Sequence, residues 1–308
     1  MNQSSGPAVS LRGVTKTFGA HTAVNNLSLT VPRGTVYGFI GPNGSGKTTT
    51  LRMIMRILHP DSGEVEVLGE HTTLAASDRV GYLPEERGLY KSMTVRDVLK
   101  FYAALKGLRR SRPAVDDWIE RMGLTEWAGK KVQALSKGMS QKVQFIAAVV
   151  AKPELVLLDE PFSGLDPVNL EVIRDAVLDL RRQGMTVIFS THDMNVAERM
   201  CDSIFMIYRG NKVLDGTLDS IQATYGSDTL RVRLNGDGRV PAHLPGVQKL
   251  TDFGRYQELR LADGVDSQSV LAAVMAHGRV LHFELARPSL QDIFVRIAAP
   301  EADGGDHV

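Results

Sequence analysis

Residues 41–48 read GPNGSGKT and follow directly on the apolar run 35–40 (TVYGFI). The run predicts a buried strand, and residues 47–58 have a helical pattern that ends before His59-Pro60. Glycines in such a loop let the backbone turn its N–H groups inward, and the following helix N-terminus adds roughly half an elementary positive charge. Strand, loop and helix in this order match the P-loop pattern G-x-x-x-x-G-K-[ST]. The segment therefore predicts a binding site for the phosphates of a nucleoside triphosphate.

Two side chains of this loop have different expected roles in binding the nucleotide. Lys47 supplies a full positive charge to the β- and γ-phosphates, and the Thr48 hydroxyl is placed to bind Mg²⁺. The residues that we expect to hold the phosphates are Gly41, Pro42, Asn43, Gly44, Ser45, Gly46, Lys47, Thr48 and Thr49.

Residues 155–161 (LVLLDEP) predict the acidic part of the same nucleotide-binding site. Four apolar residues predict a buried strand, which ends in two adjacent carboxylates. Asp159 is placed to hold Mg²⁺ through its hydration shell, and Glu160 to orient an attacking water. An acidic pair after a strand is on its own typical of a solvated loop. Together with the P-loop it predicts hydrolysis of the nucleotide.

Size and composition narrow the class of protein. A chain of 308 residues is long enough for two domains of about 150 residues each. The net charge of +1 argues against a dedicated nucleic-acid binder. No apolar run approaches the roughly 18 residues that a membrane span requires, and the N-terminal residues lack a secretory signal. The single cysteine, Cys201, excludes an intrachain disulfide framework and fits a reducing cytoplasm.

The rest of the first two thirds of the chain alternates between strands and helices. Residues 9–31 alternate as two short strands, and residues 94–129 have a helical pattern that starts with a capping pair, Thr94 and Asp97. Residues 155–190 form a second strand–helix–strand block. Hydrophobic strands between helices indicate a parallel sheet that is covered on both faces.

The composition changes after about residue 216. Strands are predicted at 229–234, 257–261 and 280–285, and helices at 267–276 and after Pro288. These elements predict a small α+β domain, followed by a solvated tail.

Further segments resemble one family of P-loop ATPases. Residues 135–142 (LSKGMSQK) resemble an LSGGQ-type signature, and residues 163–166 (SGLD) follow the acidic strand as that family's D-loop does. His192 lies just after the strand MTVIFS, where the family has its switch histidine, and Phe18 occupies the place of its adenine-stacking aromatic. Over residues 9–217 the sequence is similar to the nucleotide-binding subunits of the ABC transporter superfamily.

The resemblance implies an assembly as well as a fold. In this family the signature of one subunit closes over the ATP that the other subunit holds. It therefore implies a homodimer in which Ser136, Gly138 and Asp166 contact nucleotide, while His192 contacts the γ-phosphate. It also implies a separately encoded membrane permease as partner, and a location at the cytoplasmic face of the membrane.

Two features depart from the family pattern. The Q-loop glutamine aligns with Glu85, which places an anion near the phosphates that could still bind Mg²⁺. The signature carries Lys137 and Met139 where Gly and Gln are usual, and Lys137 could offset the charge of Glu85 in a closed dimer.

Three segments resemble a narrower group within the family. Residues 81–90 (GYLPEERGLY), 136–142 (SKGMSQK) and 288–294 (PSLQDIF) are similar to bacterial exporter ATPases of the drug, polysaccharide and sodium efflux group. The region from about residue 227 resembles the accessory domain of that group, which is dimer-stabilising or simply structural. The cargo is not encoded here, because the membrane partner selects it.

Two other classes of protein remain as alternatives. Soluble ABC ATPases of translation carry two cassettes, and those of DNA repair insert a long coiled coil between P-loop and signature, whereas this chain has one P-loop and about ninety residues between the motifs. A GTPase or a small-molecule kinase is the second alternative. Guanine specificity would need an N-K-x-D element, and residues 211–215 (NKVLD) miss that spacing by one.

The sequence thus predicts an α/β fold. It comprises a P-loop NTPase core with a mostly parallel sheet, an N-terminal antiparallel β-subdomain, an inserted helical subdomain and a small C-terminal α+β domain. The expected boundaries are 8–220 for the ATP-binding domain, with the helical subdomain at about 88–152, then 227–299 for the accessory domain and flexible tails at 1–7 and 300–308.

Overall fold

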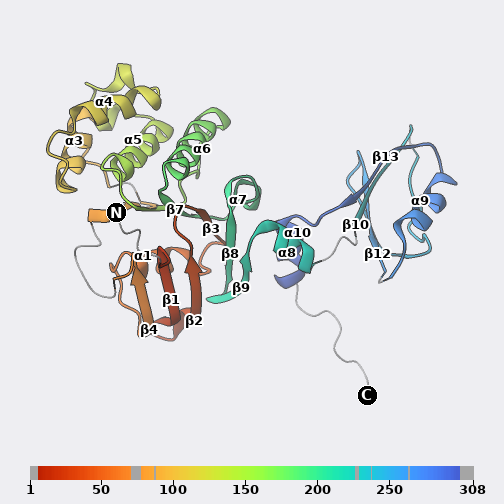
Figure 1. The fold of residues 1–308 in the computed structure, drawn as a ribbon. Coiled ribbons are helices and arrows are strands. Elements are labelled where there is room, and N and C mark those ends of the chain that lie inside the picture. Colours follow the sequence, from red (N-terminus) through yellow and green to blue (C-terminus); the bar gives the residue numbers. More distant parts are fainter. Residues whose placement is uncertain are drawn as a thin grey trace. The chain divides into compact units, whose positions relative to one another are not determined.

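A computed structural model gives the fold of the chain (Figure 1). It describes residues 6–70, 78–86, 88–225, 229–236, 238–262 and 264–298. Residues 1–5 and 300–308, which make up most of the two expected tails, lie outside the described residues. The chain divides into two compact units, Met1–Leu218 and Asp219–Val308.

A six-stranded sheet forms the centre of the first unit, in the order β5-β6-β7-β3-β8-β9. Neighbouring strands run parallel except for β9, which is antiparallel to β8. Every residue of β3, β6 and β7 is buried, as expected for parallel strands with both faces covered. The mostly parallel core is therefore confirmed. The strands are β3 (Val36–Ile40), β5 (Val80–Leu83), β6 (Leu155–Asp159), β7 (Thr186–Thr191), β8 (Ser203–Tyr208) and β9 (Asn211–Gly216).

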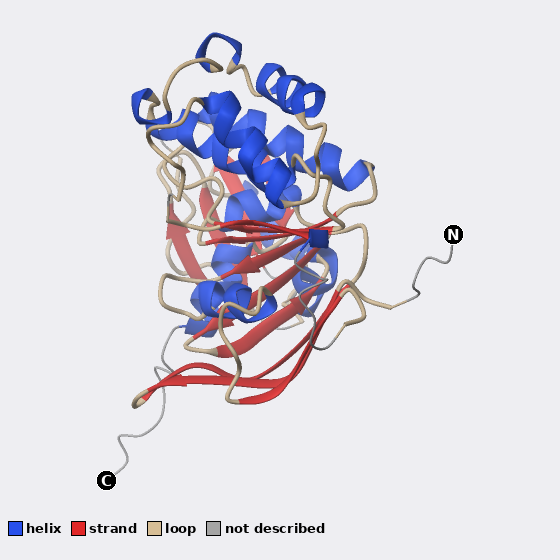
Figure 2. Cartoon of the chain, turned by 90° about the vertical axis from the view of Figure 1, so that its left-hand side faces the viewer, coloured by secondary structure: helices blue, strands red, loops and turns tan. Residues whose placement is uncertain are grey.

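An antiparallel sheet covers one face of the central sheet, as the alternating N-terminal segment predicted. Its order is β2-β1-β4, with β1 (Val9–Phe18), β2 (His21–Val31) and β4 (Ser62–Val67). Helix α1 (Lys47–Ile54) packs between the two sheets, where its Leu51 joins Leu11 and Phe39 in one apolar core. Figures 1 and 2 show this antiparallel sheet on the side of the central sheet away from the larger helices.

Helices cover the other face. They are α3 (Val95–Leu105), α4 (Arg112–Arg121), α5 (Lys137–Val149), α6 (Pro167–Arg182) and α7 (Met194–Met200), with short 3₁₀ turns at Thr125–Trp127 and Val132–Ala134. The Thr94 side chain accepts a hydrogen bond from the Asp97 backbone N–H, which confirms the predicted start of α3. None of the helices in the described part of the chain is both long and apolar enough to cross a bilayer.

Two helical predictions were too long. The stretch 94–129 is broken after Leu105, because Gly107 adopts a φ of +78° that ends α3 before Pro113 opens the next helix. The helix predicted over 47–58 ends at Ile54, since Arg56 takes a φ of +57° and the chain turns toward β4. In each case a left-handed residue, which the apolar spacing does not reveal, terminates the helix.

The second unit is a four-stranded antiparallel sheet in the order β11-β12-β10-β13 with helices, which confirms the predicted α+β character. Helix α9 packs its Val270 and Val274 onto the sheet. Strand β11 was not predicted, because its residues are only partly buried and lack a clear alternation. The elements are α8 (Leu218–Thr224), β10 (Thr229–Leu234), β11 (Val247–Asp252), β12 (Gln257–Leu261), α9 (Ser267–Met275), β13 (Val280–Ala286) and α10 (Leu290–Ala298).

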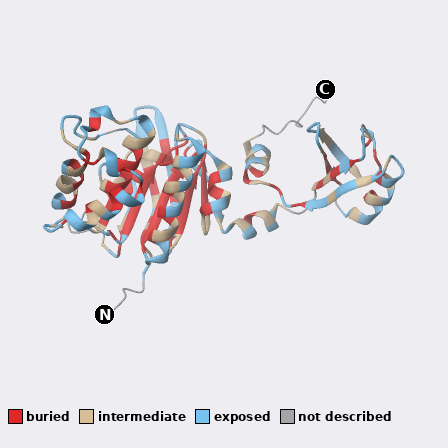
Figure 3. Ribbon diagram, turned by 90° about the horizontal axis from the view of Figure 1, so that it is seen from above, coloured by how far each residue is buried: buried red, intermediate tan, exposed pale blue. Residues whose placement is uncertain are grey.

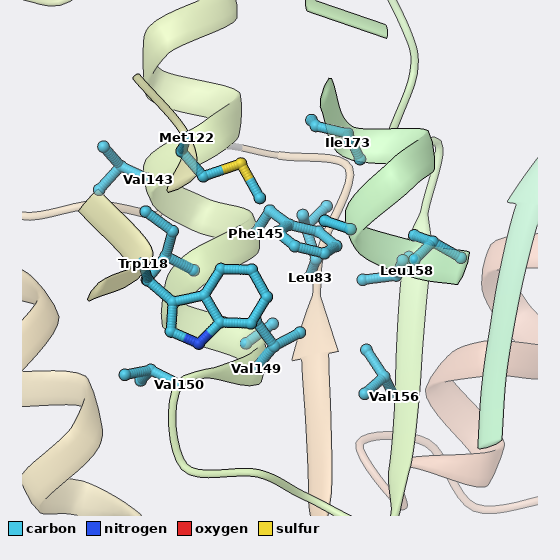
Figure 4. Close-up of a cluster of buried hydrophobic side chains, with 14 of the residues drawn as sticks. Leu83, Trp118, Met122, Val143, Phe145, Val149, Val150, Val156, Leu158 and Ile173 are labelled. Carbon is cyan, nitrogen blue, oxygen red and sulfur yellow. The ribbon is translucent and has the colours of Figure 1, made fainter. Parts of the chain in front are cut away.

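Buried side chains concentrate along the central sheet and under the helices of the first unit (Figure 3). In the close-up, Phe145 of α5 lies among Trp118, Leu83 and Leu158 (Figure 4). The rings of Phe145 and Trp118 meet edge to face with centroids 5.9 Å apart. Phe145 therefore packs helices α4 and α5 together and, through the same apolar cluster, links them to Leu83 of β5 and Leu158 of β6.

We expect Phe145→Ala to lower the free energy of unfolding of the first unit by about 3–5 kcal/mol, because it leaves a cavity among side chains with no room to collapse. Urea unfolding followed by tryptophan fluorescence measures this unit alone, since both tryptophans, Trp118 and Trp127, lie in it. Phe253→Ala, at a half-exposed ring of the second unit, is the control and should leave the transition in place. A loss below about 1 kcal/mol would contradict the packing role of Phe145.

Candidate functional site

Close backbone contacts fix the loop between β3 and α1. A Cβ atom on Gly41 would lie 2.2 Å from the carbonyl oxygen of Ile207, and one on Gly46 would lie 2.4 Å from that of Ala23. Both glycines also have φ angles of +151° and +112°, in the region that L side chains rarely adopt. Gly44 has a φ of +76° but faces open space. Glycine is therefore required at these positions by the neighbouring strands and by backbone conformation.

The ammonium group of Lys47 lies inside the loop. Its Nζ donates hydrogen bonds to the carbonyl oxygens of Gly41 at 2.7 Å and Pro42 at 3.1 Å, and lies 3.8 Å from Oε1 of Glu160. Burial lowers the pKa of Lys47, and the nearby carboxylates oppose this shift. The loop thus surrounds a buried cation whose partners are mostly neutral carbonyls.

Asp159 ends β6 with a fully buried carboxylate. Its Oδ1 accepts hydrogen bonds from the hydroxyls of Ser190 at 2.5 Å and Thr48 at 3.2 Å. Its Oδ2 is buried and has no hydrogen-bond partner among the described residues. A buried carboxylate oxygen without a donor is costly, and a divalent cation is a chemically suitable partner for it. The residues at this point therefore fit Mg²⁺.

Glu160 is held beside this carboxylate in an unusual backbone conformation. Its φ is +50°, which is rare for a residue with a side chain and is stabilised here by a hydrogen bond from its N–H to the Ser190 hydroxyl at 2.9 Å. Its carboxylate oxygens lie 3.0 and 3.1 Å from Nδ1 of His192. The structure thus brings Glu160, His192 and Lys47 together at the carboxyl ends of the parallel strands.

A cavity of about 400 Å³ opens beside the loop. Phe18, half exposed at the end of β1, lines it, and so does Glu85, which follows β5. The cavity is therefore bordered by an aromatic ring, by phosphate-loop residues and by carboxylates. Its lining comprises Phe18, His21, Ala23, Asn43, Gly44, Gly46, Lys47, Thr48, Thr49, Glu85 and Glu160.

Ser136, Gly138 and Asp166 lie elsewhere, at two neighbouring helix N-termini. The Ser136 side chain caps α5 by accepting from the backbone N–H of Met139, and the Asp166 side chain caps α6 by accepting from that of Asn169. A Cβ atom on Gly138 would lie 3.3 Å from Nδ2 of Asn169, so the two helix ends pack closely. None of the three lines the cavity beside the phosphate loop.

Lys137, which replaces the usual glycine of the signature, contacts the segment that follows β6. The Lys137 side chain packs over Gly164, where an added Cβ atom would lie 2.2 Å from Nζ. Its charge therefore lies against the segment between β6 and α6. The prediction that Lys137 offsets the charge of Glu85 concerns a closed dimer and stays a prediction.

Ser190 is the functional residue that sequence reasoning missed. Its hydroxyl contacts both acidic residues, because the parallel register of β6 and β7 places Ser190 opposite Asp159. A polar residue directly after the apolar run 187–189 (VIF) is the signal that could have identified it. His21, which lines the cavity at the start of β2, carried no such signal.

Comparison with known families agrees with this geometry. Residues 24–163 match the family described as "ABC transporter", and residues 129–198 match an "AAA domain, putative AbiEii toxin, Type IV TA system". Residues 216–298 match the C-terminal domain described as "ATP-binding protein DrrA1-3-like". The family matches therefore cover both units of the chain.

Individual relatives are similar to this chain over nearly its whole length. An uncharacterised ABC transporter ATP-binding protein of Bacillus subtilis, YhaQ, is 41% identical over 92% of this chain and 95% of its own. The Nod factor export ATP-binding protein I of Burkholderia lata is 33% identical over 95% of this chain and 97% of its own. A solved ATP-binding subunit of an ABC transporter superposes with a TM-score of 0.67 at 28% identity, covering 71% of this chain and 93% of that one. The chain therefore belongs to the ATP-binding subunits of ABC transporters, a family that hydrolyses ATP to power transport and includes export-type members.

Proposed function

We propose that this subunit powers an exporter, works as a homodimer and is joined to the membrane by a separately encoded permease. The observation that carries the hydrolytic part is the arrangement of Lys47, Asp159, Glu160 and His192 around one end of the parallel sheet. Export is supported by the relative named for export of Nod factor and by the DrrA-like match of the C-terminal unit. No nucleic-acid partner is proposed.

ATP binding is assigned to the residues around the loop. Phe18 stacks on the adenine, and residues 41–49 hold the phosphates through backbone N–H groups, with Lys47 as the point charge. Thr48, Glu85 and Asp159 would hold Mg²⁺, and the bound ion would neutralise part of the phosphate charge. Support comes from the unpaired Oδ2 of Asp159 and from the position of Glu85 on the cavity wall.

Hydrolysis is assigned to Glu160 with help from His192. The Glu160 carboxylate orients water and accepts its proton as the water attacks the γ-phosphorus, giving ADP and phosphate. His192 holds the Glu160 carboxylate through Nδ1 and reaches the γ-phosphate through its ring, which is half exposed. Ser190 fixes the backbone of Glu160, and it is a positioning residue.

The homodimer accounts for the residues that lie apart from the cavity. Ser136 and Gly138 present a hydroxyl and a helix N-terminus, which suit the phosphates of ATP held by a second copy, and Asp166 lies beside them. We assign the ATP-binding domain to residues 8–220, with its helical subdomain at about 88–152, and the accessory domain to 227–299. The permease places this assembly at the cytoplasmic face of the membrane.

Glu160→Gln removes the carboxylate and keeps the size of the side chain. We expect ATP binding to survive through the loop, while hydrolysis falls by roughly 10²–10⁴, as is typical for loss of a general base. A phosphate-release assay and equilibrium binding of a fluorescent ATP analogue measure the two effects. Glu126→Gln, the same change at an exposed position, is the matched control. Unchanged hydrolysis in Glu160→Gln would remove this residue from the catalytic role.

Blocked hydrolysis should also trap the closed assembly. In size-exclusion chromatography, Glu160→Gln should gain a dimer on addition of Mg-ATP, and adding Ser136→Arg should remove that gain. If ATP produces no such gain at high protein concentration, the subunit does not dimerise without its permease, whereas the phosphate chemistry still stands.

Glu85→Gln restores the neutral amide that is usual at this position in the family. If Glu85 helps to bind Mg²⁺ or water, ATP affinity should stay within a few-fold and turnover should change modestly or rise. The neighbouring Glu86→Gln is the matched control, because Glu86 does not line the cavity. Loss of ATP binding in Glu85→Gln would show that this residue is misplaced in the proposed site.

The isolated subunit should remain in the supernatant after centrifugation of membranes and should pellet only when its permease is co-expressed. We assign the contact to residues 86–94 and α3, where exposed Tyr90 packs edge to face on Phe101. Tyr90→Ala should therefore reduce the pelleted fraction, and Phe253→Ala should not. Salt-resistant membrane attachment of the subunit alone would contradict a permease-dependent location.

A further inference from the structure

Phe18, the ring assigned to the adenine, lies at the tip of the hairpin formed by β1 and β2. It is half exposed and pairs across the turn with His21. Register shifts interrupt the pairing of β1 with β2 at three places between Leu11 and Thr17. The last two pairs of the hairpin, at Thr17 and Phe18, are therefore separated from the regular part of the antiparallel sheet.

On its other side, β1 extends beyond the end of its partner strand β4. The pairing of these two strands ends at Thr15, opposite Ser62. The preceding residue, Asp61, donates its backbone N–H to the carbonyl oxygen of Thr15 at 2.8 Å. Its side chain reaches further, since Oδ2 accepts hydrogen bonds from the backbone N–H and the hydroxyl of Thr17, each at 2.7 Å. The Asp61 carboxylate thus continues the contact with β1 where the backbone of β4 ends.

The same carboxylate places a cation beside the ring of Phe18. Its Oδ1 accepts a hydrogen bond from Nζ of Lys16 at 2.7 Å, and this Nζ lies 5.7 Å from the centroid of the Phe18 ring. Hydrogen bonds from Lys16 and Thr17 lower the pKa of Asp61 to about 2, so the carboxylate is ionised near neutral pH. Asp61 therefore fixes both the backbone next to Phe18 and the charged group that contacts its ring.

The other strand of the hairpin is held by different contacts. A Cβ atom on Gly210 would lie 3.1 Å from the carbonyl oxygen of Ala23 and 3.2 Å from that of Thr22, so β2 packs against the turn after β8. Asp61 itself does not line the cavity beside the phosphate loop. Loss of its side chain should therefore release Phe18 while the phosphate loop and β2 keep their positions.

We infer that Asp61 is a positioning residue for the adenine of the bound nucleotide, and that it acts by holding Phe18 at the wall of the cavity. The inference rests on the proposed stacking of Phe18 on adenine. Stacking of a base on an aromatic ring depends on the offset and the angle between the two planes, so a displaced ring stabilises the base less. Asp61 therefore contributes to the affinity for the base and not to the affinity for the phosphates.

Binding of ADP and of pyrophosphate, each measured with Mg²⁺ by isothermal titration calorimetry, separates these two contributions. Asp61→Ala should weaken the binding of ADP by about three- to tenfold and change that of pyrophosphate by less than about twofold. Asp116→Ala is the matched control and should bind both as wild type does, because its carboxylate also pairs with a cation, Arg96, and is 39% exposed against 41% for Asp61. Unchanged ADP binding in Asp61→Ala, or equal losses for ADP and pyrophosphate, would overturn the inference.

Steady-state hydrolysis gives a second readout. Asp61→Ala should raise KM for ATP and leave kcat within about twofold, since it removes affinity for the base without changing the groups around the γ-phosphate. A loss confined to kcat would contradict a role in holding the base.

A double-mutant cycle tests whether Asp61 acts through the ring. Phe18→Ala should weaken ADP binding by about tenfold, and adding Asp61→Ala should cause no further loss, because the ring that Asp61 holds is gone. Asp61→Asn keeps an oxygen acceptor for the N–H of Thr17 and should retain more of the ADP affinity than Asp61→Ala. Additive losses in the double variant would show that Asp61 acts by another route, contrary to the inference.

The inference and the proposed function fail in different ways. If Phe18→Ala weakens ADP binding but Asp61→Ala does not, Asp61 is not a positioning residue, and the proposed role of Phe18 stands. If Phe18→Ala leaves ADP binding unchanged, the adenine does not stack on Phe18, and both assignments fall. The assignment of the phosphates to residues 41–49 is unaffected in either case.

Discussion

The site depends on a buried negative charge at the end of β6. Asp159 is fully buried, and two hydroxyls donate to one of its oxygens while the other has no partner among the described residues. The Ser190 hydroxyl that holds it also accepts from the backbone of Glu160, and Glu160 in turn contacts His192. The register of β6 and β7, the left-handed backbone of Glu160 and the position of His192 therefore meet at this one buried carboxylate.

Much of this arrangement could be predicted from the sequence because it is local. The phosphate loop needs glycines and a lysine within eight consecutive residues, and an apolar strand before Asp159 and Glu160 is visible by inspection. Thr94 and Asp97 likewise cap a helix from positions three residues apart. Local patterns of this kind are set by backbone conformation and by short-range hydrogen bonds.

What the sequence did not reveal depends on contacts between distant segments. Ser190 lies 31 residues from Asp159, and only the parallel pairing of β6 and β7 brings them together. The end of α1 depends on the left-handed conformation of Arg56, a residue type that gives no such signal. Strand β11 was missed because its partial burial erases the alternation by which strands are recognised.

The glycines of the phosphate loop have a mechanical consequence. Gly41 lies against the backbone of Ile207 in β8, while Gly46 lies against the backbone of Ala23 in β2, and these strands belong to different sheets. The phosphate loop is thus in close contact with the central sheet through Gly41 and with the antiparallel sheet through Gly46. A rotation of one sheet against the other must change the shape of the loop, so a nucleotide that fixes the loop also limits how far the two sheets can turn.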